Sequence, residues 1–139
     1  MDEVAPNLYV GTLADAGDTA LLHDYNVDSI VSLTHGHPES GFPVPVSNCA
    51  MMDGPRNRQE TFRTAVEEVL AGLDRGETTL VHCSRGASRS PSVAATVVAL
   101  HTESSIEEAF ELIGEQRDEF DPHPAIVRQA VSVYRAFPK

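Results

Sequence analysis

Apolar and polar residues follow two different rhythms along this chain. Apolar and polar positions alternate at residues 29–34, and residues 78–82 form a short, largely apolar run rich in β-branched residues. Residues 7–10 are also largely apolar and are followed by Gly11. A further short extended segment lies within residues 44–52. These patterns are typical of strands that bury one or both faces, so all four segments are predicted to be strands.

The second rhythm has the period of a helix and is clearest at residues 61–73. Apolar side chains recur there at positions that share one helical face: Phe62, Ala65, Val66, Val69, Leu70 and Leu73. Gly76 follows, as expected of a residue just beyond a helix end. A shorter helix, begun by Asp18 and reaching Tyr25, is predicted nearer the N-terminus.

Helices dominate the last third of the chain. One contains Pro91 in its first turn, where the missing N–H costs little, and runs to about His101. The next is begun by a serine with a glutamate three residues later, and either Ser104 or Ser105 fits this capping box. It ends before an Asp-Pro pair, and the last helix covers residues 124–136.

The order of these elements predicts the fold class. Strands alternate with helices early in the sequence, and helices follow one another late. We therefore expect one α/β domain over residues 1–139, with a mostly parallel central sheet of about four to five strands and helices on both sides. Segments rich in Gly and Pro at residues 35–45 and 53–57 predict loops between the elements.

The charge of the chain limits its partners. Asp and Glu number 21 against 10 Lys and Arg, the formal net charge is −11, and Lys139 is the only lysine. Such a surface repels polyanions, so neither nucleic acid nor an anionic membrane is expected to bind. The composition is similar to that of proteins from salt-loving archaea; an ordinary acidic protein of a mesophile is the alternative.

The sequence contains no pattern for export or membrane insertion. The first residues carry two acids and no basic residue, unlike a signal peptide, and the longest apolar stretch, residues 93–100, is too short to span a bilayer. Cys49 and Cys83 lack the number and spacing of a disulfide scaffold or a zinc site. We expect a cytoplasmic protein, monomeric rather than oligomeric, with two free thiols.

The densest chemistry lies in residues 82–90, which read HCSRGASRS and join a buried strand to a helix. A short loop that turns into a helix start directs its N–H groups into one concavity, which suits a tetrahedral oxyanion. Gly86 gives this loop conformations that a Cβ resists. Cys83 is expected at its floor, where the helix N-terminus, the amides and Arg89 all favour the thiolate.

The side chains of this loop suit nucleophilic chemistry on a phosphate ester. The Cys83 thiolate can attack phosphorus and form a phosphocysteine. Arg89 can hold two phosphate oxygens with its planar guanidinium, and Ser90 can donate a hydrogen bond to the departing sulfur. His82 is expected to order the loop through hydrogen bonds. The remaining positions complete the phosphate-binding loop: Ser84, Arg85, Gly86, Ala87 and Ser88.

Simpler structural explanations exist for these residues. A cysteine that ends a buried strand is commonly a small hydrophobic residue, and a Gly/Ser/Arg loop is commonly a solvated turn. A cysteine followed six residues later by an arginine is by itself a weak signal. The full order of strand, His-Cys, Gly, Arg-Ser and helix is what favours catalysis.

The segment VHCSRGASRSP, residues 81–91, resembles the signature loop of the dual-specificity protein phosphatases, within the protein tyrosine phosphatase superfamily. The resemblance covers almost the whole chain: residues 5–34 look like the opening strand–helix–strand of that family, and residues 105–129 look like its C-terminal helices. It implies a central sheet flanked by helices. It also implies hydrolysis of phosphotyrosine, phosphoserine and phosphothreonine through a phosphocysteine, without a metal or cofactor.

The resemblance also implies a general acid. Family members carry an aspartate on a loop about thirty residues before the cysteine, and Asp53 occupies that place. It would protonate the leaving oxygen and then deprotonate the attacking water, which is typically worth ~10²–10⁴-fold in rate. An aspartate before Gly-Pro is also a common turn residue. The adjacent Arg56, Asn57 and Arg58 either line the pocket rim or are solvated.

Other activities share parts of this chemistry. The same loop can serve a phosphatase of phosphoinositides, nucleotides or sugar phosphates, so the expected substrate is a phosphorylated protein or a small phosphate ester. A non-catalytic phosphate-binding module is disfavoured because nucleophile, clamp and acid are all present. A rhodanese-like sulfurtransferase also uses a loop cysteine, but the full loop pattern and the upstream acid argue against it.

Cys49 and the histidines of residues 35–37 each have a functional and a structural explanation. By resemblance to some superfamily members, Cys49 could form a protective disulfide with Cys83, although a buried strand cysteine is the favoured explanation. His35 and His37 lie on a Gly/Pro loop without further placed ligands, so no metal site is expected.

Overall fold

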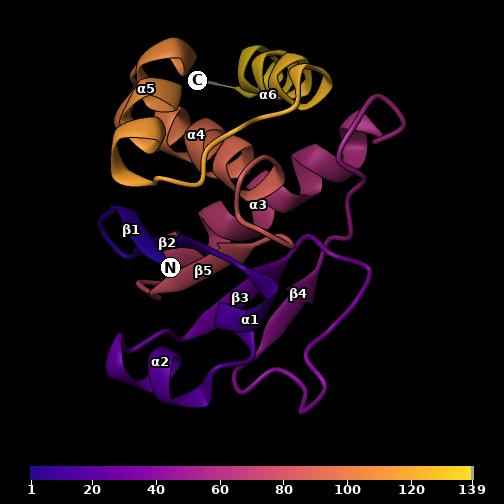
Figure 1. Cartoon of the computed structure of the whole chain (residues 1–139). Helices are drawn as coiled ribbons and strands as arrows, with labels where there is room; N and C mark the ends of the chain where they lie inside the picture. Colours follow the sequence, from indigo (N-terminus) through magenta and orange to yellow (C-terminus); the bar gives the residue numbers. More distant parts are fainter. Residues whose placement is uncertain (139) are drawn as a thin grey trace.

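The computed structural model describes residues 1–138 and places a five-stranded sheet at the centre of the chain (Figure 1). The strand order across the sheet is β1-β2-β5-β3-β4. The strands are β1 (Asp2–Ala5), β2 (Leu8–Gly11), β3 (Ser29–Ser32), β4 (Val46–Asn48) and β5 (Thr79–His82). The four segments predicted as strands are confirmed, with ends displaced by one or more residues.

Four of the five strands run parallel, as predicted. Strand β5 lies between β2 and β3, and β3 pairs with β4, all in parallel register. The exception is β1, which the sequence analysis did not predict and which pairs antiparallel with β2. The two are joined through Pro6 and Asn7, and Asn7 has a φ of 65°, in the left-handed region that asparagine tolerates in turns.

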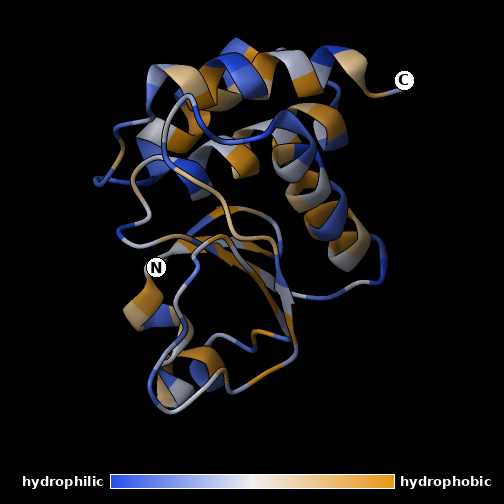
Figure 2. Cartoon of the chain, turned by 90° about the vertical axis from the view of Figure 1, so that its right-hand side faces the viewer, coloured by the Kyte–Doolittle hydropathy of each residue, from blue (hydrophilic) through white to orange (hydrophobic). Residues whose placement is uncertain are grey.

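Alternation along the strands produces two apolar layers. In the central β5, Val81 belongs to the core on one face and Leu80 to the core on the other. In β3, Val31 and Ile30 divide in the same way. Figures 1 and 2 show helices α3 to α6 above the sheet and the short α1 and α2 below it. Helices on both sides of a mostly parallel sheet confirm the predicted fold class.

The six helices within residues 1–138 begin and end where local chemistry allows. They are α1 (Leu13–Ala16), α2 (Thr19–Asp24), α3 (Gln59–Asp74), α4 (Arg89–Thr102), α5 (Ile106–Gln116) and α6 (Pro124–Ala136). Asp18 caps α2, and Ser105, not Ser104, caps α5 by accepting from the Glu108 N–H. Gly76, with a φ of 77°, follows the end of α3 as predicted.

Helix α4 lies at the centre of the helical layer. Every residue from Ser90 to Ala99 is buried, and the helix contacts α3, α5 and α6 as well as β2 and β5. A helix covered on all sides needs no polar face, which explains its weak apolar periodicity. The first turn of α4 is therefore held rigidly by its neighbours. Residues 83–88 connect it to the carboxyl end of β5.

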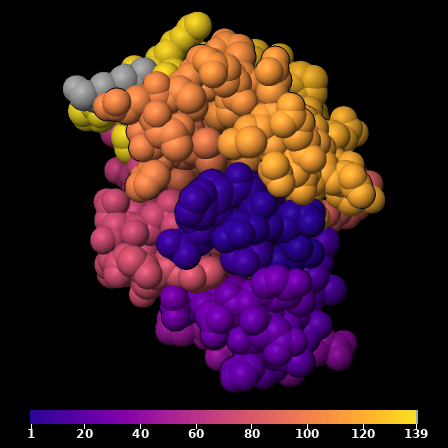
Figure 3. All heavy atoms as spheres, turned by 90° about the vertical axis from the view of Figure 1, so that its left-hand side faces the viewer, coloured from indigo at the N-terminus to yellow at the C-terminus, as the bar shows by residue number. Residues whose placement is uncertain are grey.

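The N-terminal strand pair closes one edge of the sheet against the helical layer. In the space-filling view of Figure 3 the indigo N-terminal residues lie between the orange C-terminal helices and the purple segment below. Strand β1 contacts α5 directly. Among residues 1–138, no helix has the length and apolarity needed to cross a bilayer.

Candidate active site

Residues 83–88 connect the buried end of β5 to the first turn of α4 at the carboxyl edge of the parallel strands. In open α/β sheets this edge is where ligands bind. Cys83 is the first residue after β5, and only 2% of it is exposed. Its backbone N–H donates to the carbonyl of Gly11 at the end of β2, at 3.4 Å. The neighbouring strand therefore fixes where the cysteine side chain begins.

Two groups of Ser90 surround the thiol. The Cys83 sulfur lies 3.2 Å from the Ser90 hydroxyl oxygen and 3.5 Å from the Ser90 backbone nitrogen, whose hydrogen points at the sulfur. Ser90 is fully buried in the first turn of α4. A thiolate here receives an N–H donor, a hydroxyl donor and the positive end of the helix dipole, which are the conditions that stabilise it.

His82 is a fully buried ring that links two strands to the loop. Its Nδ1 lies 3.2 Å from the Cys83 carbonyl and its Nε2 lies 2.8 Å from the Ser32 hydroxyl at the end of β3. Burial lowers the pKa of this imidazole, so the ring is neutral at pH 7. Because a carbonyl only accepts, Nδ1 carries the hydrogen and Nε2 accepts from Ser32.

Arg89 is held by groups from three separate segments. One terminal nitrogen donates to the carbonyl of Met51 at 2.9 Å and to that of Leu33 at 3.4 Å. The other donates to the Ser84 hydroxyl at 3.2 Å. A guanidinium has five N–H donors in a planar fork, so this arrangement orients the fork and leaves hydrogens for a ligand.

Asp53 lies on the loop after β4 and reaches the same place. Its carboxylate oxygen accepts a hydrogen bond of 2.6 Å from the Ser88 hydroxyl. Together these residues line a small pocket of about 50 Å³: Asp53, Cys83, Ser84, Arg85, Ala87, Ser88 and Arg89. The fold thus brings the predicted acid, nucleophile and clamp to one pocket, although the acid and the loop are separated by thirty residues in sequence.

The loop conformation depends on Gly86 and on an arginine that the sequence analysis missed. Gly86 has a φ of 67°, and a Cβ there would lie 2.8 Å from the Gly11 carbonyl and would collide with Arg117. Arg117 is buried, and its guanidinium donates to the carbonyls of Gly86 at 2.6 Å and Arg85 at 3.1 Å. It also pairs with Asp2 of β1 at 2.8 Å. Arg117 therefore fixes the outer side of the loop.

The loop that carries Asp53 is attached to α6 by Asn57, which was expected at the pocket rim or in solvent but is buried, and by Gln129, which the sequence did not indicate. The buried Asn57 side chain accepts from the Met52 N–H at 3.0 Å and donates to Gln129 at 2.8 Å. Gln129 in return donates to the Asn57 carbonyl. Asn57 is thus a structural residue of this loop, whereas the adjacent Arg56 and Arg58 are exposed.

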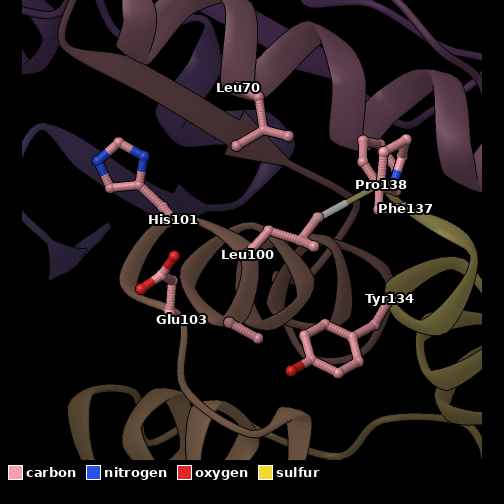
Figure 4. Close-up of a pocket in the computed structure, with 8 residues that line it drawn as sticks. Leu70, Leu100, His101, Glu103, Tyr134, Phe137 and Pro138 are labelled. Carbon is pink, nitrogen blue, oxygen red and sulfur yellow. The ribbon is translucent and has the colours of Figure 1, made fainter.

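A larger cavity lies away from this pocket. It measures about 600 Å³ and is lined by Leu70, Ala99, Leu100, His101, Glu103, Tyr134, Phe137 and Pro138 (Figure 4). Its α4 residues lie in the last turns of that helix, whereas the loop precedes the first turn. With a rise of about 1.5 Å per residue, most of the helix length separates the two.

Cys49 is also a free thiol, but its surroundings differ from those of Cys83. Burial, reinforced by the nearby Glu68, raises the pKa of Cys49 to about 11, so this thiol stays protonated at neutral pH. Within residues 1–138, no three His, Cys, Asp or Glu side chains are grouped as a metal site, and His35 and His37 are exposed.

The geometry suits one kind of ligand. The Cys83 thiol, the Arg89 guanidinium and the Asp53 carboxyl group line one pocket, whose volume suits a single tetrahedral group. Nucleophile, charge stabiliser and acid within reach of one reacting atom are the parts needed for displacement at phosphorus.

Comparison with known proteins agrees with this geometry. The family model described as dual specificity phosphatase, catalytic domain, matches residues 8–136. Human dual specificity protein phosphatase 22 is 27% identical over 130 residues, covering 93% of this chain and 71% of the relative. The tyrosine-protein phosphatase vhp-1 of Caenorhabditis elegans is 24% identical over 124 residues, covering 86% of this chain but only 19% of that much longer protein.

Solved structures show the same architecture. The crystal structure of human DUSP28 superimposes with a TM-score of 0.88 at 24% sequence identity, covering 98% of this chain and 96% of that chain. At this identity the likeness shows a shared fold. The mixed sheet with β1 at its edge and the helices on both faces are thus features of a known architecture.

Proposed function

Because this chain belongs to the dual specificity phosphatase catalytic-domain family, we propose that it hydrolyses phosphate monoesters of proteins through a phosphocysteine on Cys83. The observation that carries the proposal is the pocket itself, in which Cys83, Arg89 and Asp53 come together from separate parts of the chain. Phosphotyrosine and phosphoserine or phosphothreonine side chains are the proposed substrates, since a pocket of about 50 Å³ selects for the phosphate group.

In the first step, the Cys83 sulfur attacks phosphorus while the bond from phosphorus to the leaving oxygen breaks. Asp53, protonated at this stage, gives its proton to that oxygen, so the product leaves as an alcohol or phenol. Arg89 and the loop N–H groups bind the phosphoryl oxygens, where charge is concentrated in the transition state. No step in this sequence calls for a metal or a cofactor.

In the second step, water attacks the phosphocysteine and the bond from phosphorus to sulfur breaks. The Asp53 carboxylate takes the proton of the attacking water. Ser90 donates a hydrogen bond to the departing sulfur, consistent with the 3.2 Å between its hydroxyl oxygen and Cys83. The products are inorganic phosphate and the free enzyme.

The remaining loop residues have supporting roles in this proposal. The backbone N–H groups of Ser84, Arg85, Gly86, Ala87 and Ser88 form the phosphate cradle, and neutral His82 orders the loop from behind. We further propose a cytoplasmic, monomeric protein. Its acidic composition supports the proposal that it binds neither nucleic acid nor an anionic membrane.

The first test is hydrolysis of p-nitrophenyl phosphate with EDTA present, at salt concentrations from low to multimolar. Wild type should be active, Cys83→Ser inactive, and Asp53→Ala slower by ~10²-fold or more. Dephosphorylation of tyrosine and serine phosphopeptides then measures the preference. A folded wild-type protein that is inactive at every salt concentration, yet binds phosphate, would instead be a phosphate-binding module.

A further inference from the structure

Ser88 has an unusual role for the N-cap residue of a helix. Serine is favoured at this position because its hydroxyl accepts a hydrogen bond from the first turn. The hydroxyl of Ser88 makes no such bond to α4, although only 6% of the residue is exposed. It donates instead to one carboxylate oxygen of Asp53, Oδ1, at 2.6 Å.

The direction of this hydrogen bond is set from the other side by the connection between α5 and α6. The His123 backbone N–H donates to the Ser88 hydroxyl oxygen at 2.8 Å. Two residues earlier, the Asp121 N–H donates to the Ala87 carbonyl at 2.7 Å, so two backbone groups of this connection, in addition to the Arg117 side chain, bind the phosphate loop. A backbone N–H can only donate, so Ser88 must accept there, and its single hydrogen is free to point at Asp53.

We propose that Ser88 is a positioning residue for Asp53, holding Oδ1 so that Oδ2 carries the proton delivered to the leaving oxygen. This proposal rests on the proposed function and adds to it a reason why an exposed loop aspartate is a competent acid. An aspartate without this bond samples other rotamers, and proton transfer requires a donor within hydrogen-bond reach of the leaving oxygen.

The role has a chemical signature. A strongly basic leaving group needs a proton in the transition state, and a weakly basic one needs it far less. Loss of acid positioning must therefore slow phenyl phosphate more than 2,4-dinitrophenyl phosphate. A general distortion of the loop must slow both esters alike, because both depend equally on Cys83 and Arg89.

The experiment compares kcat/KM of wild type and Ser88→Ala on these two esters. We expect Ser88→Ala to lower kcat/KM for phenyl phosphate by roughly 10- to 100-fold and to leave that for 2,4-dinitrophenyl phosphate within about threefold of wild type. In an Asp53→Asn background, Ser88→Ala should cause no further loss on phenyl phosphate. The thermal unfolding of each variant is measured alongside.

Ser92→Ala is the matched control. The Ser92 hydroxyl donates to the Ser88 carbonyl at 2.7 Å but does not contact Asp53, so its loss loosens the same residue without touching the acid. This variant should change both esters by the same factor. If Ser88→Ala does not fold, Ser88→Gly replaces it, since glycine is tolerated at an N-cap.

Equal losses on both esters in Ser88→Ala, or a full further loss in the Asp53→Asn background, would overturn the positioning role. The proposed function fails separately: in that case wild type is inactive on both esters, or Cys83→Ser keeps its activity.

Discussion

At the scale of single residues, His82 shows how burial sets a protonation state. The ring is fully buried and neutral because burial lowers its pKa below the ordinary value of 6.5. Its bond to the Cys83 carbonyl requires a hydrogen on Nδ1, and in the neutral ring Nε2 then accepts from the Ser32 hydroxyl. The ring also lies against Phe42, at 5.9 Å between ring centroids, so a charge there has little access to water.

The buried, neutral His82 ring predicts that the protein loses stability on acidification. As pH falls through about 6.5, His82 takes up a proton in the unfolded chain but not in the folded one, so the free energy of unfolding decreases. The slope from one such group is at most about 1.4 kcal/mol per pH unit, and it disappears once the folded ring is also protonated. Urea unfolding of wild type and His82→Asn between about pH 5 and about pH 8 measures the difference.

The variant should show a flatter pH profile over the acidic part of this range, whatever its absolute stability. His35→Asn, which removes an exposed imidazole, is the control and should keep the wild-type slope. A wild-type profile that is flat below pH 6.5 would contradict the assignment.

Arg117 is the second residue whose environment predicts a measurable effect. Its guanidinium is buried and bonds the carbonyls of Gly86 and Arg85, whereas its partner Asp2 has a side chain that is 42% exposed. Arg117→Met should therefore lower the free energy of unfolding by about 3–5 kcal/mol, because several buried acceptors lose their donor. Asp2→Asn should cost only about 1 kcal/mol, since water replaces part of the pair.

Phosphatase activity gives a second readout for this pair. Arg117→Met should lose most of its activity at temperatures where it is still folded, and Asp2→Asn should keep most of it. Equal destabilisation by both variants would mean that Arg117 stabilises the protein through its ion pair with Asp2 rather than through the loop carbonyls.

At the scale of elements, the segment between β4 and α3 is held by several hydrogen bonds, one of which joins Arg89 to the Met51 carbonyl. Ser88 bonds Asp53, and the Asn57–Gln129 pair bonds the segment to α6. Asn57 is buried and its side chain makes hydrogen bonds in two directions, to the Met52 N–H and to Gln129. A loop with such attachments is ordered without having secondary structure of its own.

Asn57→Ala is predicted to release this segment. It leaves the Met52 N–H and the Gln129 side-chain oxygen without their partners and should lower the free energy of unfolding by about 1–3 kcal/mol. Amide hydrogen exchange should accelerate at residues 50–58 more than in α3. The exposed Arg56→Ala is the control, and uniform acceleration throughout the chain would argue against a local role.

The sequence was informative where structure is local. Helix α3, the cap of α2 and the four strands β2 to β5 were predicted because their patterns extend over enough residues. Strand β1 was missed because DEVA is four residues long and half acidic, and its pairing depends on β2. Helix α1 has a complete capping box of Thr12 and Asp15 but is a single turn, too short for periodicity.

The residues of the candidate site also divide into those that a local pattern predicts and those that depend on distant segments. Cys83, Arg89 and Ser90 lie within eight residues, so their proximity follows from one loop, whereas Asp53 was expected from the resemblance to the phosphatase family. The bonds of Arg117 to the loop and of Ser88 to His123 join segments more than thirty residues apart. No local pattern encodes such contacts.

At the scale of the whole molecule, the dominant feature is charge. The formal net charge is −11, and like charges are also close together: Glu107, Glu111 and Glu115 are all exposed and four residues apart on α5. Such spacing places them on one side of the helix, where they repel each other. The salt-loving origin suggested by the composition remains a prediction.

Screening should therefore stabilise this protein. The Debye length falls from about 10 Å at 0.1 M to about 3 Å at 1 M salt, so the repulsion among exposed acids fades and Tm should rise as KCl is added. Glu111→Lys places a cation between Glu107 and Glu115 and should raise stability by about 0.5–1 kcal/mol at low salt. The gain should shrink above about 1 M KCl, as measured by thermal unfolding.

A neutral substitution at the same position, Glu111→Gln, separates the removal of repulsion from the addition of attraction. It should give an intermediate stability at low salt. A Tm that does not change with KCl would contradict this prediction. It would show that the acidic surface is not an adaptation to high salt.

The attachment of the phosphate loop to Arg117 has a consequence for biosynthesis. Arg117 and Asp2 are 115 residues apart, and the guanidinium that joins them also fixes the carbonyls of Arg85 and Gly86. A nascent chain that has emerged from the ribosome only as far as α4 contains the cysteine and the clamp but not this guanidinium. Its loop lacks the donors of Arg117, so we expect catalytic competence to arise late in synthesis.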